Sequence, residues 1–198
     1  MHTSYFKYLF IHVCCLSLTI LHTGCGKEEK PNIIFIFADD LGIESLKPYG
    51  GHSTITPNID RLAEEGILFT HCFANPKCSP SRAEVLTGTY PGITGMTKVL
   101  SYFEEEEFLD PVKFNSFANQ LKKAGYTSAI TGKWNLSHLE KKNTIKAFGF
   151  DEHCLWQMYD KNGIKRSRYY RPHFRINDTI VEEEINLKGG ASVRIVTI

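Results

Sequence analysis

The sequence is short of several features that mark common classes of protein. Its six cysteines form no C-x-x-C pair, which argues against a structural zinc site. Its 23 lysine and arginine residues almost balance its 22 aspartate and glutamate residues, and the net charge of +1 argues against a protein that binds nucleic acid through overall charge. It contains no internal repeat or low-complexity segment. Outside the N-terminal segment only Cys72, Cys78 and Cys154 remain, an odd number that leaves at least one cysteine unpaired or differently used.

A long hydrophobic run is also missing. The longest apolar stretch, residues 8–21, is too short to cross a membrane comfortably as a helix. It follows a lysine and precedes a polar stretch, an order typical of a signal peptide. The glycine before Cys25 resembles the end of a bacterial lipoprotein signal, although His22 stands where leucine is usual. We therefore predict a signal peptide over 1–24, a tether over 25–30, a lipid anchor on Cys25, and export to the periplasm or cell envelope; an ordinary cleaved signal is the alternative.

The rest of the chain has the composition of a globular domain. Its 198 residues, of which 42% are hydrophobic, suffice for one core. Residues 32–38 (NIIFIFA) form a continuous apolar run, which predicts a strand buried on both faces of a parallel sheet. Thr56 as the cap and Pro57 at the first position predict a helix that Gly66 ends. Residues 67–69 then predict a short strand.

The same order of elements returns later in the chain. Apolar residues recur at helical spacing at Phe114, Phe117, Leu121 and Ala124. Gly125 ends this predicted helix, and residues 126–131 (YTSAIT) predict the next strand. Strands that alternate with helices predict an α/β fold with a mostly parallel sheet flanked by helices. Residues 181–184 are compatible with a further helix.

Two adjacent carboxylates, Asp39 and Asp40, follow the first predicted strand. The carboxyl ends of strands are where α/β folds place ligands. Two like charges held together repel each other, and a hard divalent cation such as calcium or magnesium removes that cost. The alternative is that one aspartate caps the next turn while the other lies in solvent.

The segment CSPSRAEVLTG predicts a helix that begins beside a cysteine. Ser79 is a suitable cap, Pro80 suits the first helical position, and Gly88 ends the helix. Cys78 then lies just before a helix N-terminus, where amide hydrogens and the helix dipole favour anions. Arg82 follows one turn later, and its guanidinium matches the oxygens of sulfate or phosphate. This predicts an oxyanion pocket with a potential nucleophile; a buried cysteine beside a surface arginine is the alternative.

A third motif, Gly132 to Leu136 (GKWNL), follows the strand predicted over 126–131. It places Lys133 in a loop at the same carboxyl edge of the sheet. There the lysine would add positive charge to the predicted anion pocket, although a solvated surface lysine is the alternative reading of this motif alone.

Taken together, these motifs resemble the N-terminal portion of a formylglycine-dependent sulfatase, of the arylsulfatase type in the alkaline phosphatase-like superfamily. The pattern C-x-P-S-R-x-x-x-L-T-G is highly specific for that family. The matching segments stand in the family's order, at 31–42, 56–70, 78–91 and 132–136. The resemblance predicts that residues 31–188 are the N-terminal part of a sulfatase catalytic domain, with the alkaline phosphatase-like fold incomplete at its C-terminus.

The resemblance also implies a role for each matching residue. A maturation enzyme would oxidise Cys78 to formylglycine, whose hydrate would attack the sulfur of a sulfate ester. Asp39, Asp40 and the modified Cys78 would bind one calcium ion. Arg82 would stabilise the hydrate, and Lys133 would bind sulfate oxygens. The substrate would be a sulfated small molecule or a sulfated polysaccharide.

Two departures from the family pattern bear on activity. The lysine motif of the family usually ends in histidine, whereas this sequence has Asn135, which cannot act as a general base near neutral pH. The family's further metal ligands come from a segment beyond residue 198, and residues 189–198 no longer resemble the family, as if translated out of frame. We therefore expect a truncated chain that is weakly active or inactive alone. The alternatives are a phosphoester or phosphonate hydrolase of the same superfamily, and an inactive, lipid-anchored protein that binds sulfate esters.

Overall fold

The computed structural model describes residues 29–100, 108–141, 143–156, 159, 162–165 and 173–182. The predicted signal peptide, Cys25 and the atypical tail at 189–198 lie outside these residues. The chain divides into two units, Met1–Phe37 and Ala38–Ile198. All described helices and strands belong to the second unit. Each described helix is too short or too polar to span a membrane.

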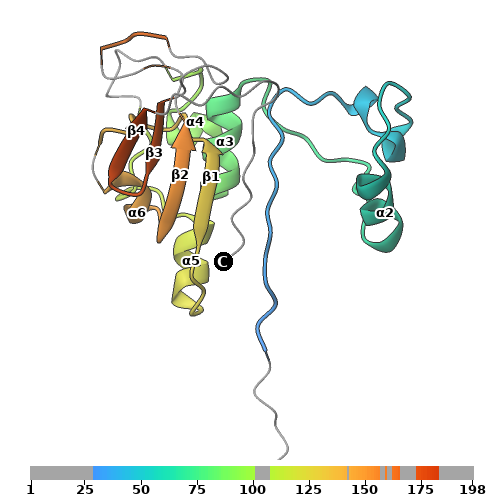
Figure 1. Ribbon diagram of the computed structural model, residues 1–198, viewed down its shortest axis with the longest axis horizontal. Helices are drawn as coiled ribbons and strands as arrows, with labels where there is room; N and C mark the ends of the chain where they lie inside the picture. The colour runs from blue at the N-terminus through green and yellow to red at the C-terminus, as the bar shows by residue number, and fades with distance from the viewer. Residues whose placement is uncertain are drawn as a thin grey trace, which may run out of the picture. The chain divides into compact units, whose positions relative to one another are not determined.

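The second unit contains a four-stranded sheet in the order β1-β2-β3-β4 (Figure 1). Its strands are Ala129–Lys133, Glu152–Trp156, His173–Ile176 and Thr179–Glu182. The strands β1 and β2 are parallel, whereas β2–β3 and β3–β4 are antiparallel. A two-residue turn joins β3 to β4, and a connection that short can join only antiparallel neighbours. The described sheet is therefore mixed, within the α/β class that the sequence predicts.

Helices accompany the sheet along the chain. The α-helices are α2 (Pro57–Glu65), α3 (Cys78–Thr87), α4 (Pro91–Thr94), α5 (Phe117–Lys123) and α6 (Thr144–Ala147), and two short 3₁₀ helices are η1 (Ile43–Ser45) and η2 (Lys47–Tyr49). The predicted helix α5 starts at Phe117 rather than Phe114, because the Ser116 hydroxyl caps it by accepting a hydrogen bond from the Asn119 amide at 3.0 Å. Figure 1 shows α3 and α5 beside β1.

One hydrophobic core joins α3, α5 and the sheet. Its fully buried members include Trp134, Phe148, Leu139 and Leu155. The rings of Trp134 and Phe148 lie 5.8 Å apart, and the Trp134 indole donates to the Ser137 hydroxyl at 2.8 Å. Because Trp134 follows the last residue of β1, this packing fixes where the chain leaves the sheet.

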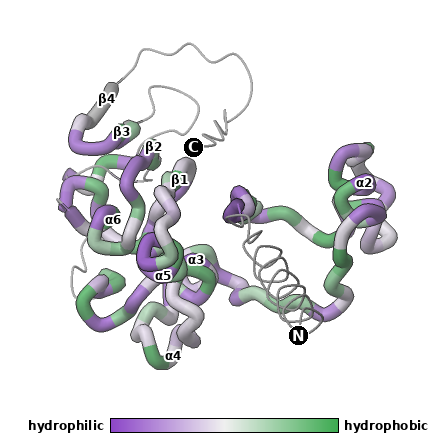
Figure 2. Tube along the Cα trace, turned by 90° about the horizontal axis from the view of Figure 1, so that it is seen from below, coloured by the Kyte–Doolittle hydropathy of each residue, from purple (hydrophilic) through white to green (hydrophobic). Residues whose placement is uncertain are grey.

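The strand predicted over 32–38 is not present in the structure. These residues are extended, but the described sheet consists of β1 to β4 and does not include them. Ile33, Ile34, Phe35 and Ile36 are 56–68% exposed. A strand requires hydrogen bonds to a neighbouring strand, and a strand's own sequence cannot supply that neighbour. In Figure 2, apolar residues along the described chain are green and hydrophilic residues are purple.

Two further local predictions were wrong, and one was displaced. Residues 67–69 form no strand, and Ile67 is 82% exposed. Residues 181 and 182 belong to strand β4, not to a helix, because the β-branched run from Thr179 favours pairing with β3. The strand predicted over 126–131 is observed as β1, three residues later at its start, in register with β2 from Ala129 to Lys133.

Candidate functional site

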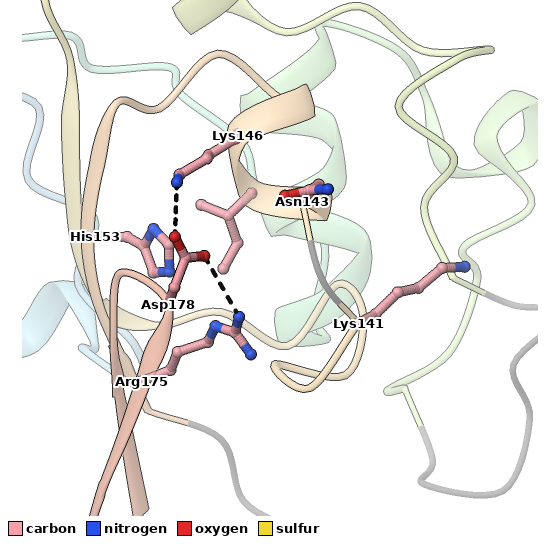
Figure 3. A pocket seen from close by; sticks show the side chains of 7 residues that line it. Lys141, Asn143, Lys146, His153, Arg175 and Asp178 are labelled. Atoms are coloured by element: carbon pink, nitrogen blue, oxygen red, sulfur yellow. Dashed lines mark hydrogen bonds and ion pairs between the residues drawn. The ribbon is translucent and has the colours of Figure 1, made fainter.

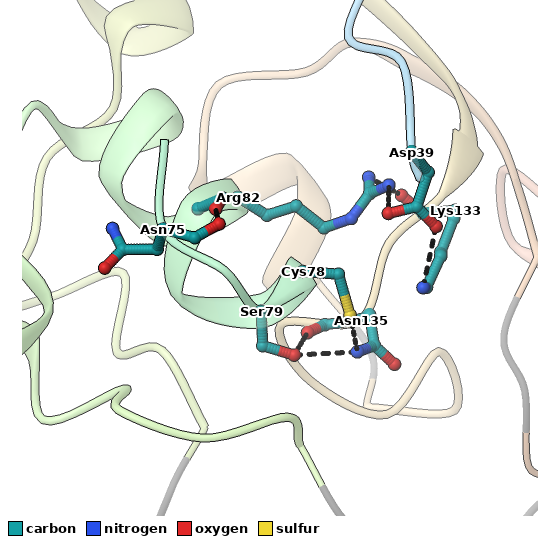
Figure 4. Close-up of polar contacts among 8 residues, drawn as sticks. Asp39, Asn75, Cys78, Ser79, Arg82, Lys133 and Asn135 are labelled. Atoms are coloured by element: carbon teal, nitrogen blue, oxygen red, sulfur yellow. Dashed lines mark hydrogen bonds and ion pairs between the residues drawn. The ribbon is translucent and has the colours of Figure 1, made fainter. Parts of the chain in front are cut away.

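The candidate site is built where helix α3 begins and strand β1 ends (Figure 4). Lys133 is the last residue of β1 rather than a loop residue. Cys78 is the first residue of α3, after Lys77 as N-cap, rather than the residue before the helix. Gly88 ends α3 in the left-handed conformation at φ 65°, as the sequence predicts. Cys78 therefore lies at the positive end of a three-turn helix.

Asp39 joins the two basic residues that the sequence assigns to the site. Its carboxylate accepts a hydrogen bond from the Lys133 ammonium at 2.9 Å and lies 3.4 Å from the Arg82 guanidinium. All three side chains are largely buried, with 19%, 12% and 13% exposed for Asp39, Lys133 and Arg82. Arg82 also donates to the backbone carbonyl of Lys133 at 2.6 Å. These contacts connect the segment after residue 38, helix α3 and strand β1.

Asn135 and Ser79 form the other side of the site. The buried Ser79 hydroxyl donates to the Asn135 carbonyl at 2.9 Å, and it accepts from the Asn135 side-chain amide at 2.7 Å and from the Leu100 amide at 3.0 Å. The Asn135 amide also lies 3.5 Å from the Cys78 sulfur. Asn135 adopts φ 56°, a left-handed conformation that asparagine tolerates better than most residues. Ser79 thus holds Asn135 against Cys78.

This role of Ser79 was not predicted. The sequence suggested Ser79 as the helix cap, but its hydroxyl makes three tertiary contacts and no capping bond. The sequence around a serine in the first turn of a helix does not indicate which distant groups its hydroxyl will contact. They lie 21 and 56 residues away in the sequence.

The environment of Asp39 keeps its carboxylate ionised. Burial raises the pKa of Asp39, but the hydrogen bond from Lys133 and the charges of Arg82 and Lys133 outweigh it and hold the pKa below the ordinary value of 3.8. The stabilisation from these contacts is therefore present above pH 3.8 and is lost as the pH falls through the lowered pKa.

A pH series with an Asp39→Asn variant would test this coupling. We expect the free energy of unfolding of the wild type to fall more steeply than that of the variant between about pH 5 and pH 2, because only the wild type must protonate this carboxylate. Urea unfolding at each pH gives both curves. Asp110→Asn is the matched control, since Asp110 is more exposed, lies 3.9 Å from Lys113, and as asparagine keeps an oxygen to accept the hydrogen bond from the Val112 amide. Parallel curves for the wild type and Asp39→Asn would contradict the prediction.

The two carboxylates have the donor chemistry of a calcium ligand set, but only part of one. Asp40 is exposed and adopts φ 56° directly after Asp39. Carboxylate oxygens suit calcium, which takes six to eight oxygen ligands. Across the described residues, no three histidine, cysteine, aspartate or glutamate side chains gather as a metal site. The two carboxylates would suit a calcium ion as two of its ligands, but they do not form a complete site by themselves.

The groups at the start of α3 and the end of β1 indicate a class of protein. A helix N-terminus, a guanidinium, an ammonium group and a cysteine meet at the carboxyl end of a parallel strand, which is where α/β proteins bind ligands. The arrangement suits an oxyanion next to a potential nucleophile. The chain is an α/β protein, and this arrangement of groups is typical of proteins that bind oxyanions.

Comparison with known proteins gives the family. The Sulfatase family model matches residues 31–189. The chain therefore belongs to the sulfatase family, and it shares the alkaline phosphatase-like fold of that family.

Several curated sulfatases are similar in sequence. The chain is 37% identical over 177 residues to N-acetylgalactosamine-6-sulfatase of Homo sapiens, which covers 83% of this chain and 34% of the relative. It is 41% identical over 126 residues to N-acetylgalactosamine-6-O-sulfatase of Bacteroides thetaiotaomicron, with 59% and 24% covered. The chain thus spans about a third of the length of the first of these relatives.

Solved structures agree with this assignment. Ps i-CgsB in complex with k-i-k-neocarrahexaose superposes with a TM-score of 0.66 at 28% identity, covering 78% of this chain and 38% of that one. The PsFucS1 sulfatase from Pseudoalteromonas sp. gives a TM-score of 0.55 at 32% identity, covering 73% and 29%.

Proposed function

We propose that the chain carries the nucleophile and part of the sulfate-binding site of a sulfatase that hydrolyses sulfate esters. The observation that supports this most is that Arg82 and Lys133 contact the Asp39 carboxylate while Cys78 begins the helix that carries Arg82 and lies beside Asn135. The residues that bear on the reaction come from three separate segments, and each of them matches the family pattern. The cysteine and the full C-x-P-S-R pattern favour sulfate over phosphate as the group transferred.

The chain's own residues would bind and orient the sulfate group. Lys133 and Arg82 offer N–H donors that are now directed at Asp39, and the start of α3 adds amide hydrogens. Once the Asp39 carboxylate turns away, these donors would stabilise negative charge that develops in the transition state. Asn135 would orient the side chain at position 78 through its amide group.

Two additions complete this proposal. A maturation enzyme that uses an external oxidant would oxidise Cβ of Cys78 to the aldehyde of formylglycine with loss of the sulfur. The hydrate of that aldehyde offers a hydroxyl group as nucleophile. Calcium, bound in part by Asp39 and Asp40, would polarise the sulfate and favour the ionised hydroxyl. Cys78 is a partly exposed free cysteine, which suits access by such an enzyme.

The substrate class is proposed from the relatives. Their names specify N-acetylgalactosamine-6-sulfate groups, and one structural neighbour holds a neocarrahexaose. We therefore propose a sulfated saccharide as substrate, with a sulfated small molecule as the alternative. Export to the cell envelope through the predicted signal peptide, with a lipid anchor at Cys25, would place the protein where such polysaccharides are met.

A binding function is the second candidate, and Asn135 favours it. The family's histidine is replaced by an amide that cannot exchange a proton near neutral pH. The side chain of Asn135 is instead committed to Ser79 and Cys78. A chain of this kind would bind a sulfate ester at Arg82 and Lys133 without cleaving it.

The decisive experiment is to produce the chain together with a formylglycine-generating enzyme. We expect the peptide that contains Cys78 to change mass to that of the aldehyde and to react with a hydrazide probe. Cys72 is the internal control, because it is exposed but lies outside the C-x-P-S-R pattern. A thiol that persists at Cys78, with the maturation enzyme shown to be active on another substrate, would overturn the catalytic proposal. Hydrolysis of a chromogenic aryl sulfate, measured with and without calcium, then separates a catalyst from a binding protein.

A further inference from the structure

A second group of charged side chains lies at the other end of the parallel strands (Figure 3). Lys133 ends strand β1, whereas His153 lies near the start of β2, which runs parallel to β1 and pairs His153 with Ile130. The two groups therefore lie at opposite ends of the parallel strands β1 and β2. The pocket at this second end is small and partly open to solvent, with room for about one water molecule beside Asp178. It is lined by Lys141, Asn143, Ile145, Lys146, His153, Arg175 and Asp178.

Arg175 is a fixed cation in the wall of this pocket. Its side chain is only 6% exposed, in the interior of strand β3. The guanidinium donates to the Leu139 carbonyl at 2.6 Å and to the Asn177 carbonyl at 2.9 Å. Its remaining nitrogen, Nη2, lies 3.7 Å from the Asp178 carboxylate. The backbone therefore holds the guanidinium in place whatever anion it faces.

The Asp178 carboxylate is the anion that now pairs with Lys146 and Arg175, and an external anion could displace it. Its carboxylate lies 2.9 Å from the Lys146 ammonium and between Lys146 and Arg175 in Figure 3. Asp178 is 65% exposed, at the turn between β3 and β4. A rotation of this exposed side chain would leave two cations directed at the pocket. Lys141 contributes less, because its ammonium lies over the ring of Phe108.

His153 gives the independent indication that the pocket binds a ligand. Its side chain lines the pocket and is 6% exposed, and neither ring nitrogen reaches a partner with full hydrogen-bond geometry in the described part of the chain, although the Asn177 backbone lies near the ring. Burial lowers the pKa of His153; the charges of Arg175 and Lys146 act in the same direction, against the Asn177 backbone and Asp178. The imidazole is therefore neutral near pH 7 and has one N–H to donate.

We propose that this pocket is a second oxyanion site, in which a sulfate or phosphate group displaces the Asp178 carboxylate from Lys146 and Arg175 and accepts the N–H of His153. The group can be an inorganic ion or an ester on a saccharide, because both present the same oxygens. The site does not depend on the chemistry proposed for Cys78.

The test is a titration of the intact chain followed by the imidazole NMR signals of His153. Sodium sulfate, sodium phosphate and methyl sulfate are compared with sodium chloride at equal ionic strength. We expect a saturable shift with the oxyanions and none with chloride. Binding of methyl sulfate as tightly as inorganic sulfate would indicate a site for esters; binding of the inorganic ions alone would restrict the site to free ions.

Three variants make the test specific. Lys146→Gln should weaken sulfate binding roughly two- to fivefold, and Asp178→Asn should strengthen it by a similar factor because the internal competitor is gone. Both side chains are partly exposed, so neither variant should prevent folding. Lys113→Gln, a change of the same charge at a residue outside the pocket that is 75% exposed, should have no effect. The proposal would be overturned if sulfate caused no shift of the His153 imidazole signals. It would also be overturned if Lys146→Gln, Asp178→Asn and the wild type bound sulfate with equal affinity. Failure of Cys78 to mature would leave this result unchanged.

Discussion

The Ser79→Ala variant is expected to lose about 3–5 kcal/mol of folding free energy, a large effect for one hydroxyl group. The hydroxyl is fully buried and serves three groups: the Asn135 carbonyl, the Asn135 side-chain amide and the Leu100 amide. Alanine lacks the hydroxyl and leaves these groups without that partner, and each buried unsatisfied group costs about 1–3 kcal/mol. The midpoint of urea unfolding measures the loss.

A second serine of the same helix is the matched control. Ser81 is also buried, but its hydroxyl makes one hydrogen bond, to the Asn75 carbonyl at 2.8 Å. Ser81→Ala should therefore cost about 1 kcal/mol. Ser79→Thr keeps the hydroxyl and should recover part of the stability. Equal losses for Ser79→Ala and Ser81→Ala would show that Ser79 does not anchor Asn135.

Inorganic sulfate is expected to bind the Asp39→Asn variant about tenfold more tightly than the wild type in calcium-free buffer. The Asp39 carboxylate occupies the donors of Lys133 and Arg82, so it competes with any external anion. Asparagine is similar in shape and removes the charge. The side-chain amide signal of Asn135, which lies beside Cys78, reports on binding at this site.

Calcium should reduce this difference, which links the prediction to the proposed function. If Asp39 turns toward calcium, its carboxylate stops competing for Lys133, and sulfate affinity of the wild type rises. The Asp39→Asn variant has lost that ligand and should respond less. Asp110→Asn, which removes a charge elsewhere, should behave as the wild type in both buffers. If calcium does not change the affinity of the wild type for sulfate, that result would argue against a calcium site at Asp39.

Helix α3 shows what the sequence by itself determined. Its start and end follow from local preferences, namely a proline in the first turn and Gly88 in the left-handed conformation, so the pattern located the start of the helix to within two residues and its end at Gly88. Helix α2 was equally predictable from Pro57 and Gly66. The same local patterns carried the resemblance to sulfatases, which the family match confirms over residues 31–189. The assignments of site residues remain proposals.

The tertiary structure decided which of these residues contact each other and through which hydrogen bonds and ion pairs. Lys133 and Asp39 are separated by 94 residues, and no local pattern reveals that the lysine holds the aspartate. The apolar run at 32–38 has the composition of a buried strand, but a strand forms only where a neighbour offers hydrogen bonds. The pocket at His153 likewise exists only because the β3–β4 turn brings Asp178 against β2 and α6. Helix boundaries depend on neighbours in sequence, whereas sites and sheets depend on neighbours in space.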